Sequence, residues 1–117
     1  MARSDARHDF LIDVLICAIE DGCINGWRTI DDWDYDAGTA VIREVGDGLP
    51  DEESTHPVDL DVLAKGIGRI NRGEVGLCTE YREGIAKADR ENDAGWLDAL
   101  SADAVLQAGL FNDLVYG

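Results

Sequence analysis

The sequence predicts an α+β fold, in which a small antiparallel sheet of two or three strands, a β-hairpin or meander, packs with about four helices. Two observations predict this class. Apolar residues recur at spacings of three and four in residues 5–20 and after residue 59, which is typical of amphipathic helices. In residues 27–45 the side chains instead follow the two-residue alternation of a strand, and β-branched residues are frequent around a central turn. We expect a single domain over residues 1–117, because 45% hydrophobic content is ordinary for a globular chain.

The first helix is expected over residues 5–20. Ser4 is its predicted N-cap, since a hydroxyl can accept a hydrogen bond from a free amide of the first turn. Gly22 is expected to end the helix. The apolar residues that recur at helical spacing, and that we expect to be buried, are Phe10, Leu11, Val14, Leu15, Cys17, Ala18 and Ile19.

The central segment is expected to form the sheet. Turn residues at 36–38 separate a first strand at 27–35 from a return strand at 39–45. A third strand is expected over residues 53–58, where Pro57 predicts either an edge position or the end of the strand. Alternation assigns one face to Trp27, Thr29, Asp31, Trp33 and Tyr35, and the other face to Arg28, Ile30, Asp32, Asp34 and Asp36. We expect both tryptophans of the first face to lie in the core.

Three more helices are expected after the sheet. Asp59 is the predicted N-cap of the second helix, which ends near Gly73, and Ser101 is the predicted N-cap of the fourth. Gly66 and Gly68 lie inside the second helical pattern, which indicates close helix packing at both glycines rather than a phosphate-binding loop. The third helix ends in the turn at 92–95, and its apolar residues are Leu77, Tyr81, Ile85 and Ala88.

Charge is the most informative property of this sequence. Twenty-five acidic residues against ten basic ones give a formal net charge of -15. Residues 31–61 hold eleven acidic residues and one basic residue, Arg43, which leaves a net charge of -10 in that segment. Self-repulsion of this kind destabilises a compact domain, so either a partner or a compositional bias must explain it. An excess of Arg over Lys and of Asp over Glu is typical of GC-rich codons, but it does not explain why the acid is concentrated in one segment.

The charge restricts the class of partner. Nucleic-acid binding depends on Lys and Arg that neutralise phosphates, and a pI near 4.2 disfavours both direct nucleic-acid binding and anionic membranes. The negative electrostatic field of this chain would attract a basic host protein or a nucleic-acid-binding complex as its partner. Three cysteines without CxxC spacing, and no apolar leader or membrane-length segment, predict a cytoplasmic protein with free thiols.

The motif of residues 32–36 has three interpretations. As a calcium loop, Asp32, Asp34 and Asp36 would take the first, third and fifth ligand positions. The loop would then need Gly at the sixth position and Glu at the twelfth, where this chain has Ala37 and Arg43. A solvated strand face explains the alternation with aromatic residues more simply. The third interpretation is a mimic of phosphate, because same-face residues of a strand repeat at about 6.6 Å, comparable to neighbouring phosphates of a nucleic-acid strand.

Other chemistry has little support in the sequence. His8 and His56 lie 48 residues apart without ligand spacing to a cysteine, and nothing supplies a third member for a Cys-His pair with Cys17. Trp96 beside Gly95 either packs at a helix boundary or lies exposed at a protein contact. We therefore expect no enzyme activity, no catalytic residues, no metal site and no cofactor.

Four short segments resemble small proteins of actinobacteria and their phages that have no assigned activity. They are His8-Asp9-Phe10-Leu11, Gly26-Trp27, Leu63-Ala64-Lys65-Gly66-Ile67 and Gln107-Ala108-Gly109-Leu110-Phe111. The resemblance spans most of the chain and carries over no functional residue. It implies a GC-rich host, a mobile-element context and the cytosol.

These observations together predict a binding protein of phage or mobile-element type. It would inhibit a host nucleic-acid-binding enzyme, such as a defence nuclease of CRISPR or restriction type, by presenting a DNA-mimicking acidic surface. The alternative is a small protein–protein interaction module whose acidity reflects genomic bias. The predicted partner-binding residues are Asp31, Asp32, Asp34, Asp36, Glu44, Asp47, Asp51, Glu52 and Glu53.

Overall fold

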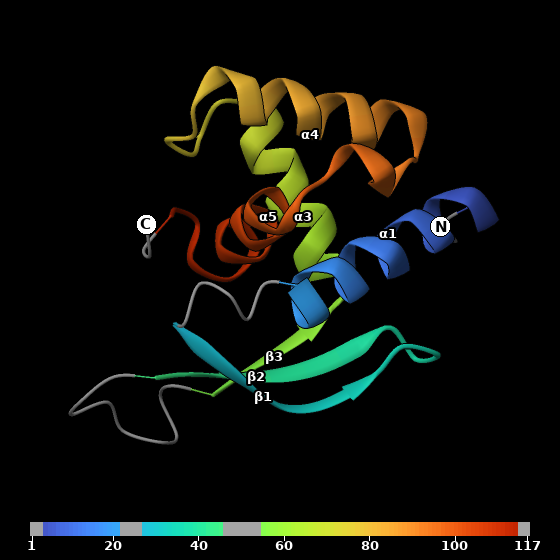
Figure 1. Ribbon diagram of the computed structural model, residues 1–117, viewed down its shortest axis with the longest axis vertical. Helices are drawn as coiled ribbons and strands as arrows, with labels where there is room; N and C mark the ends of the chain where they lie inside the picture. The colour runs from blue at the N-terminus through green and yellow to red at the C-terminus, as the bar shows by residue number, and fades with distance from the viewer. Residues whose placement is uncertain (1–3, 22–26, 46–54, 115–117) are drawn as a thin grey trace.

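The computed structural model describes residues 4–21, 27–45 and 55–114, and it confirms the predicted α+β class with four helices and a three-stranded antiparallel sheet. The helices lie on one side of the sheet, and α4 is farthest from it (Figure 1). In chain order the elements are α1 (Asp5–Ile16), the π-helical turn η1 (Cys17–Asp21), β1 (Arg28–Asp34), β2 (Thr39–Glu44), β3 (Thr55–Asp59), α3 (Leu60–Asn71), α4 (Thr79–Glu91), the 3₁₀ turn η3 (Ala94–Trp96) and α5 (Ala99–Phe111).

The sheet is a meander with strand order β1-β2-β3, so β1 and β3 are its edges. The turn between β1 and β2 closes at Gly38, whose amide donates to the carbonyl of Tyr35 over 3.2 Å. Gly38 has a φ of 72°, a left-handed conformation that glycine adopts without steric cost. Pro57 lies in β3, so its predicted edge position is confirmed. The N-terminal part of the predicted third strand, Glu53 and Ser54, lies outside the described residues.

A β-bulge in β1 overturns part of the predicted alternation. The register with β2 shifts between Ile30 and Asp32, so Asp31 is an extra residue without a direct partner. Beyond the bulge, every side chain changes face relative to strict alternation. Trp33 therefore lies opposite Ala40 near the rim of an edge strand, where it is 57% exposed. The prediction that Trp33 belongs to the core was wrong, whereas Trp27, which precedes the bulge, is buried as predicted.

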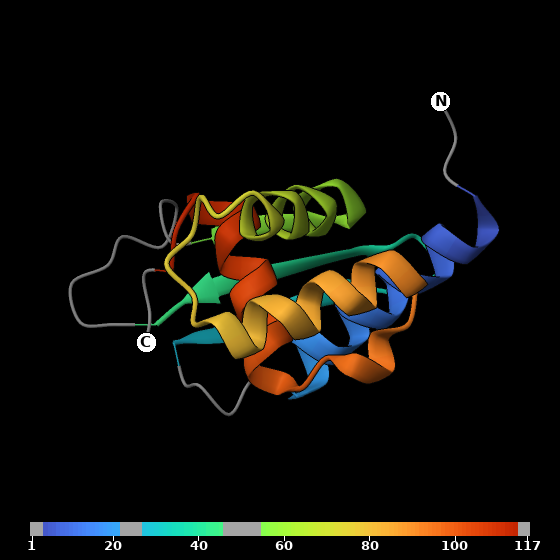
Figure 2. The same ribbon diagram turned by 90° about the horizontal axis from the view of Figure 1, so that it is seen from above.

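The core lies between the inner face of the sheet and the helices α1, α3 and α5. Helix α5 is buried continuously from Ser101 to Gly109, with helices or strands on every side. It crosses α3 closely, and Figure 2 shows the two helices from above. A β-carbon added to Gly66 would lie 2.0 Å from the carbonyl oxygen of Val105. The predicted role of Gly66 in close helix packing is confirmed.

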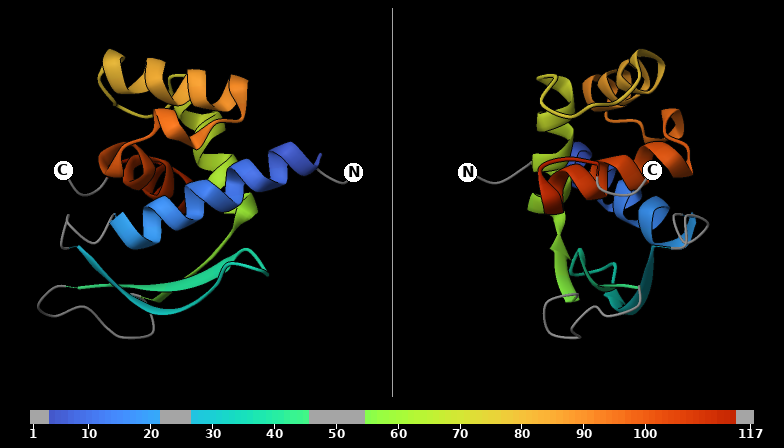
Figure 3. Two further views of the ribbon diagram at one scale, coloured as in Figure 1. Left: turned by 45° about the vertical axis from the view of Figure 1, so that its right-hand side comes forward. Right: turned by 90° about the vertical axis from the view of Figure 1, so that its left-hand side faces the viewer.

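Helix boundaries follow their caps. Ser4 caps α1 by accepting from the amide of Arg7, and Asp59 caps α3 by accepting from the amide of Val62, both as predicted. The cap predicted for the last helix was wrong. Asp98, not Ser101, is the N-cap of α5, and its carboxylate accepts from the amide of Ser101 over 2.7 Å. Because β3 runs directly into α3, the cap of α3 is also the last residue of the sheet (Figure 3).

No helix in the described ranges is long and apolar enough to cross a membrane. The predicted end of the first helix, Gly22, falls outside these ranges, and within them α1 continues into the π-helical turn η1.

Candidate partner-binding surface

The outer face of the sheet is the surface that faces away from the helices, and no described element covers it (Figure 3). Residues opposite one another in neighbouring strands point to the same side, so the register assigns this face. The buried Ala40, Ile42 and Val58 belong to the inner face. The outer face consists of Thr29, Asp32, Asp34, Thr39, Val41, Arg43, Thr55, Pro57 and Asp59.

Three exposed carboxylates dominate one end of the outer face. Asp32 and Asp34 are successive outward residues of β1, so they are about 6.6 Å apart along the strand. Thr39 of β2 lies opposite Asp34 on one side and opposite Asp59 on the other. The two edge strands therefore present carboxylates on either side of a central threonine, about 10 Å apart at two strand spacings. Asp36 is exposed in the adjoining turn.

Local hydrogen bonds orient these carboxylates without neutralising them. Asp32 accepts from the amide of Trp33 over 2.9 Å, and Asp34 accepts from the amide of Ala37 over 3.1 Å. Asp59 accepts from the first turn of α3, where the helix dipole favours a negative charge. Each donor is a neutral backbone amide, so the negative charge stays on the surface.

Arg43 is the single base among the outer-face residues, and Asp31 neutralises it. The guanidinium of Arg43 donates to Oδ2 of Asp31 through Nη2 at 2.8 Å and through Nε at 3.1 Å. The bulge that makes Asp31 the extra residue of β1 leaves it able to reach Arg43 on the neighbouring strand. The pair lies at the opposite end of the face from Asp34 and Asp59, so it does not offset their charge locally.

The remaining predicted binding residues do not join this surface. Glu44 lies on the inner face opposite Arg28, and its carboxylate oxygen is 2.8 Å from Nε2 of His56. The Glu44 side chain is 15% exposed. Four predicted residues lie outside the described parts of the chain: Asp47, Asp51, Glu52 and Glu53.

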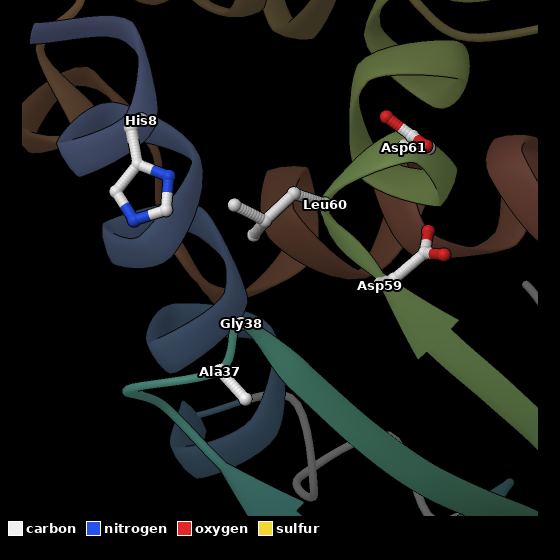
Figure 4. A pocket seen from close by; sticks show the side chains of 6 residues that line it. All are labelled: His8, Ala37, Gly38, Asp59, Leu60 and Asp61. Carbon is white, nitrogen blue, oxygen red and sulfur yellow. The ribbon is translucent and has the colours of Figure 1, made fainter. Parts of the chain in front are cut away.

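A small pocket beside the hairpin turn extends the acidic surface around the end of the sheet. His8 from α1, the turn residues Ala37 and Gly38, and Leu60 line it together with Asp59 and Asp61 (Figure 4). In this view the two carboxylates lie on the α3 side and the imidazole lies across from them on α1. His8 is exposed, as expected for the first turns of a surface helix.

The acidic residues do not converge as metal ligands do. Asp32 and Asp34 project side by side from a strand, and Asp36 belongs to the turn that follows. Calcium needs six to eight oxygens around one point. Within residues 4–21, 27–45 and 55–114, no group of three His, Cys, Asp or Glu side chains is placed to hold a metal ion.

A buried polar cluster lies at the other end of the sheet, and the sequence analysis missed it. Asp103 of α5 pairs with the guanidinium of Arg28, whose side chain is 0% exposed. The same carboxylate accepts from Nε1 of Trp27 at 2.9 Å and from Nε2 of Gln107 at 2.7 Å. Arg28 also donates to the carbonyl of Ala18 in η1. An acid and an amide four residues apart in the otherwise apolar α5 were the available signal.

This cluster holds elements together and does not expose reactive groups. Both oxygens of Asp103 have hydrogen-bond partners. Two of the three guanidinium nitrogens of Arg28 also donate, one to Asp103 of α5 and one to the carbonyl of Ala18 in η1. Among the described buried side chains, Nε of Arg28 is the one polar atom without a partner. The outer face of the sheet therefore remains the better candidate for function.

Comparison with protein-family models, with curated proteins and with solved structures found no match to this chain.

Proposed function

We propose that this protein binds a basic protein partner through the outer face of its sheet and inhibits that partner by occupying a channel meant for nucleic acid. The observation that carries the proposal is the uncovered face on which Asp32, Asp34 and Asp59 are exposed around Thr39, with Asp36 beside them. The protein acts by binding and not by catalysis, and it needs no metal or cofactor. The phage-type context comes from the sequence resemblance alone.

Two physical features support mimicry of a phosphate backbone. A strand fixes its outward carboxylates at a regular spacing, and the amide contacts of Asp32 and Asp34 hold them in place, so little side-chain entropy is lost on binding. The neighbouring base on this face is already paired with Asp31. A row of preorganised negative charges is what a groove lined with Lys and Arg recognises in DNA or RNA.

The test uses the variant in which Asp32, Asp34 and Asp36 are all changed to Asn. Asn keeps the carbonyl oxygen that accepts the local amide bonds, so the turn survives while three charges are lost. The wild-type protein is immobilised and partners are captured from bacterial lysate at low salt, then identified after elution at high salt. Double-stranded DNA is next added to the purified partner as a competitor. We expect DNA to displace the wild-type protein, and the triple variant to bind at least about tenfold more weakly.

The matched control removes the same number of charges from another surface. Glu80, Glu83 and Glu91 are exposed on α4, in the layer farthest from the sheet, and changing all three to Gln should leave binding within about twofold. Simultaneous binding of DNA and this protein to the partner would contradict the proposal. If the partner stays bound at high salt, and binds the triple Asn variant as tightly as the triple Gln variant, the result would instead support a protein–protein interaction module without mimicry.

A further inference from the structure

A shallow apolar hollow lies on the inner side of the β1 edge, next to the acidic surface. Ile30 and Trp33 of β1, Tyr35 of the turn, and Ile19 and Glu20 of η1 line it. Its most exposed apolar side chain is Trp33, which is 57% exposed, while Ile30 packs against the core. We name it the Trp33 hollow. It exists because the bulge at Asp31 turns Trp33 to the inner side of an edge strand.

Trp33 differs from the two other tryptophans in its electrostatic partners. Trp27 lies against the guanidinium of Arg28, with 4.8 Å from Cζ to a ring centroid. Trp96 lies beneath the ammonium of Lys87 at 3.6 Å. In the described parts of the chain, neither a cation nor another ring contacts the indole of Trp33. The exposed indole face of Trp33 is therefore an unused site for a cation.

The charges around the hollow favour a cationic guest. Among the described residues of its lining, Glu20 is the only charged one, and none is Lys or Arg. Asp32 and Asp34 flank Trp33 in sequence and are exposed on the other side of the same edge strand. A second copy of this chain would bring the same carboxylates together, which disfavours a homodimer at this edge. The bulge also interrupts the regular ladder that an added β-strand would need.

We infer that the Trp33 hollow receives an arginine side chain of the basic partner. This inference rests on the proposed function and specifies how the partner is recognised. The planar guanidinium stacks on the indole of Trp33, its apolar stem covers Ile30, and Glu20 accepts from the guanidinium. The carboxylates of the outer face attract further basic residues of the same segment. Lysine fits less well, because its compact ammonium is strongly hydrated and cannot stack.

The experiment uses two short unstructured peptides as probes, so it does not depend on identifying the partner. One peptide alternates three arginines with threonines, and the other replaces each arginine with lysine. Each is titrated into the ¹⁵N-labelled protein at low ionic strength, and the backbone and indole N–H resonances are followed. We expect the arginine peptide to shift the indole resonance of Trp33 and the amides of Glu20 and Ile30, and to bind about three- to tenfold more tightly than the lysine peptide.

Trp33→Leu keeps an apolar side chain but removes the ring. It should therefore weaken binding of the arginine peptide about three- to tenfold and abolish the difference in affinity between the two peptides. Trp96→Leu is the matched control, since Trp96 is 48% exposed but already beneath Lys87, and it should change neither affinity. Equal affinities for the two peptides, an unaltered affinity in Trp33→Leu, or no binding of either peptide would overturn the inference. If Trp33→Leu weakens binding of the arginine peptide but DNA and this protein do not compete for the purified partner, the hollow stands and the proposed mimicry fails.

Discussion

At the scale of single residues, two glycines set the distance between α3 and α5. A β-carbon on Gly66 would lie 2.0 Å from the carbonyl oxygen of Val105, and one on Gly109 would lie 2.1 Å from the carbonyl oxygen of Val62. Both contacts involve backbone, which cannot move aside without shifting a helix. Because Gly66 and Gly109 carry no β-carbon, α3 and α5 can approach closely, and this close approach positions α5 in the core.

The first prediction compares two glycines of the same helix. Gly66→Ala should lower the free energy of unfolding by about 1–3 kcal/mol or more, because α3 and α5 must separate. Gly68→Ala should raise it by up to about 1 kcal/mol, because alanine favours the helix. The added methyl of Gly68→Ala would meet only the flexible end of Arg72. Urea unfolding measures both variants, and equal effects would contradict the proposed close packing.

At the scale of elements, one buried ion pair joins the start of β1 to α5 and η1. Arg28 of β1 pairs with Asp103 of α5 and donates to the carbonyl of Ala18 in η1. That carbonyl belongs to the last turn of the first helix, where a positive charge is favourable. The pair therefore fixes the start of β1 relative to η1, ten residues away in sequence, and to α5, 75 residues away.

Removing one member of this pair should lower the free energy of unfolding more than removing both. Asp103→Leu leaves a charged guanidinium buried without a counterion, which should lower the free energy of unfolding by about 3–5 kcal/mol. The double variant Arg28→Met with Asp103→Leu should recover part of that loss, because neither charge remains in the core, whereas Nε1 of Trp27 and Nε2 of Gln107 still lose this acceptor. Denaturant unfolding of the two single variants and the double variant gives the coupling energy. A coupling energy near zero would show that the pair does not stabilise the fold.

The elements differ in how far local sequence determines them. The starts of α1 and α3 are visible in sequence because the caps Ser4 and Asp59 act within one turn. The bulge at Asp31 is set by pairing with β2, so the alternation of β1 could not show that Thr29 and Trp33 lie on opposite faces of the sheet. The predicted binding residues include Asp32, Asp34 and Asp36 of the candidate surface but not Asp59. Their grouping around Thr39 and the separation of Glu44 depend on the strand register, which local patterns do not contain.

At the scale of the whole molecule, most described basic residues lie in the helical layers, where acidic residues accompany them, and few lie in the sheet. The exposed acids of the hairpin and outer face lie below the helices, while Lys65, Arg69 and Lys87 belong to α3 and α4 (Figure 1). Arg69 is held inside the fold, where it donates to the carbonyl of Ala108 over 2.6 Å. The exposed carboxylates of the outer face and turn therefore lie near one another with no unpaired base among the outer-face residues, so they repel one another.

This charge predicts a stability that rises with salt. Raising sodium chloride from about 0.01 M to about 0.15 M shortens the Debye length from about 30 Å to about 8 Å, which screens the repulsion. We expect the thermal midpoint of the wild-type protein to rise by several degrees. The variant with Asn at positions 32, 34 and 36 should start higher at low salt and respond less. Scanning calorimetry in both salts measures this, and a midpoint that falls or stays constant with salt would contradict it.

The burial of residues 101–109 in α5 also determines the order in which this chain can fold. Residues 101–109 are covered on all sides, and they pair in space with α3 and with η1, which precede them by tens of residues. During synthesis the ribosome releases α5 after every other described element, so the surfaces of α3 and η1 that α5 covers are exposed until then. Contacts of such long sequence separation slow folding and leave apolar surface open in the meantime. The nascent protein therefore acquires its core in one late step, when residues 99–111 emerge.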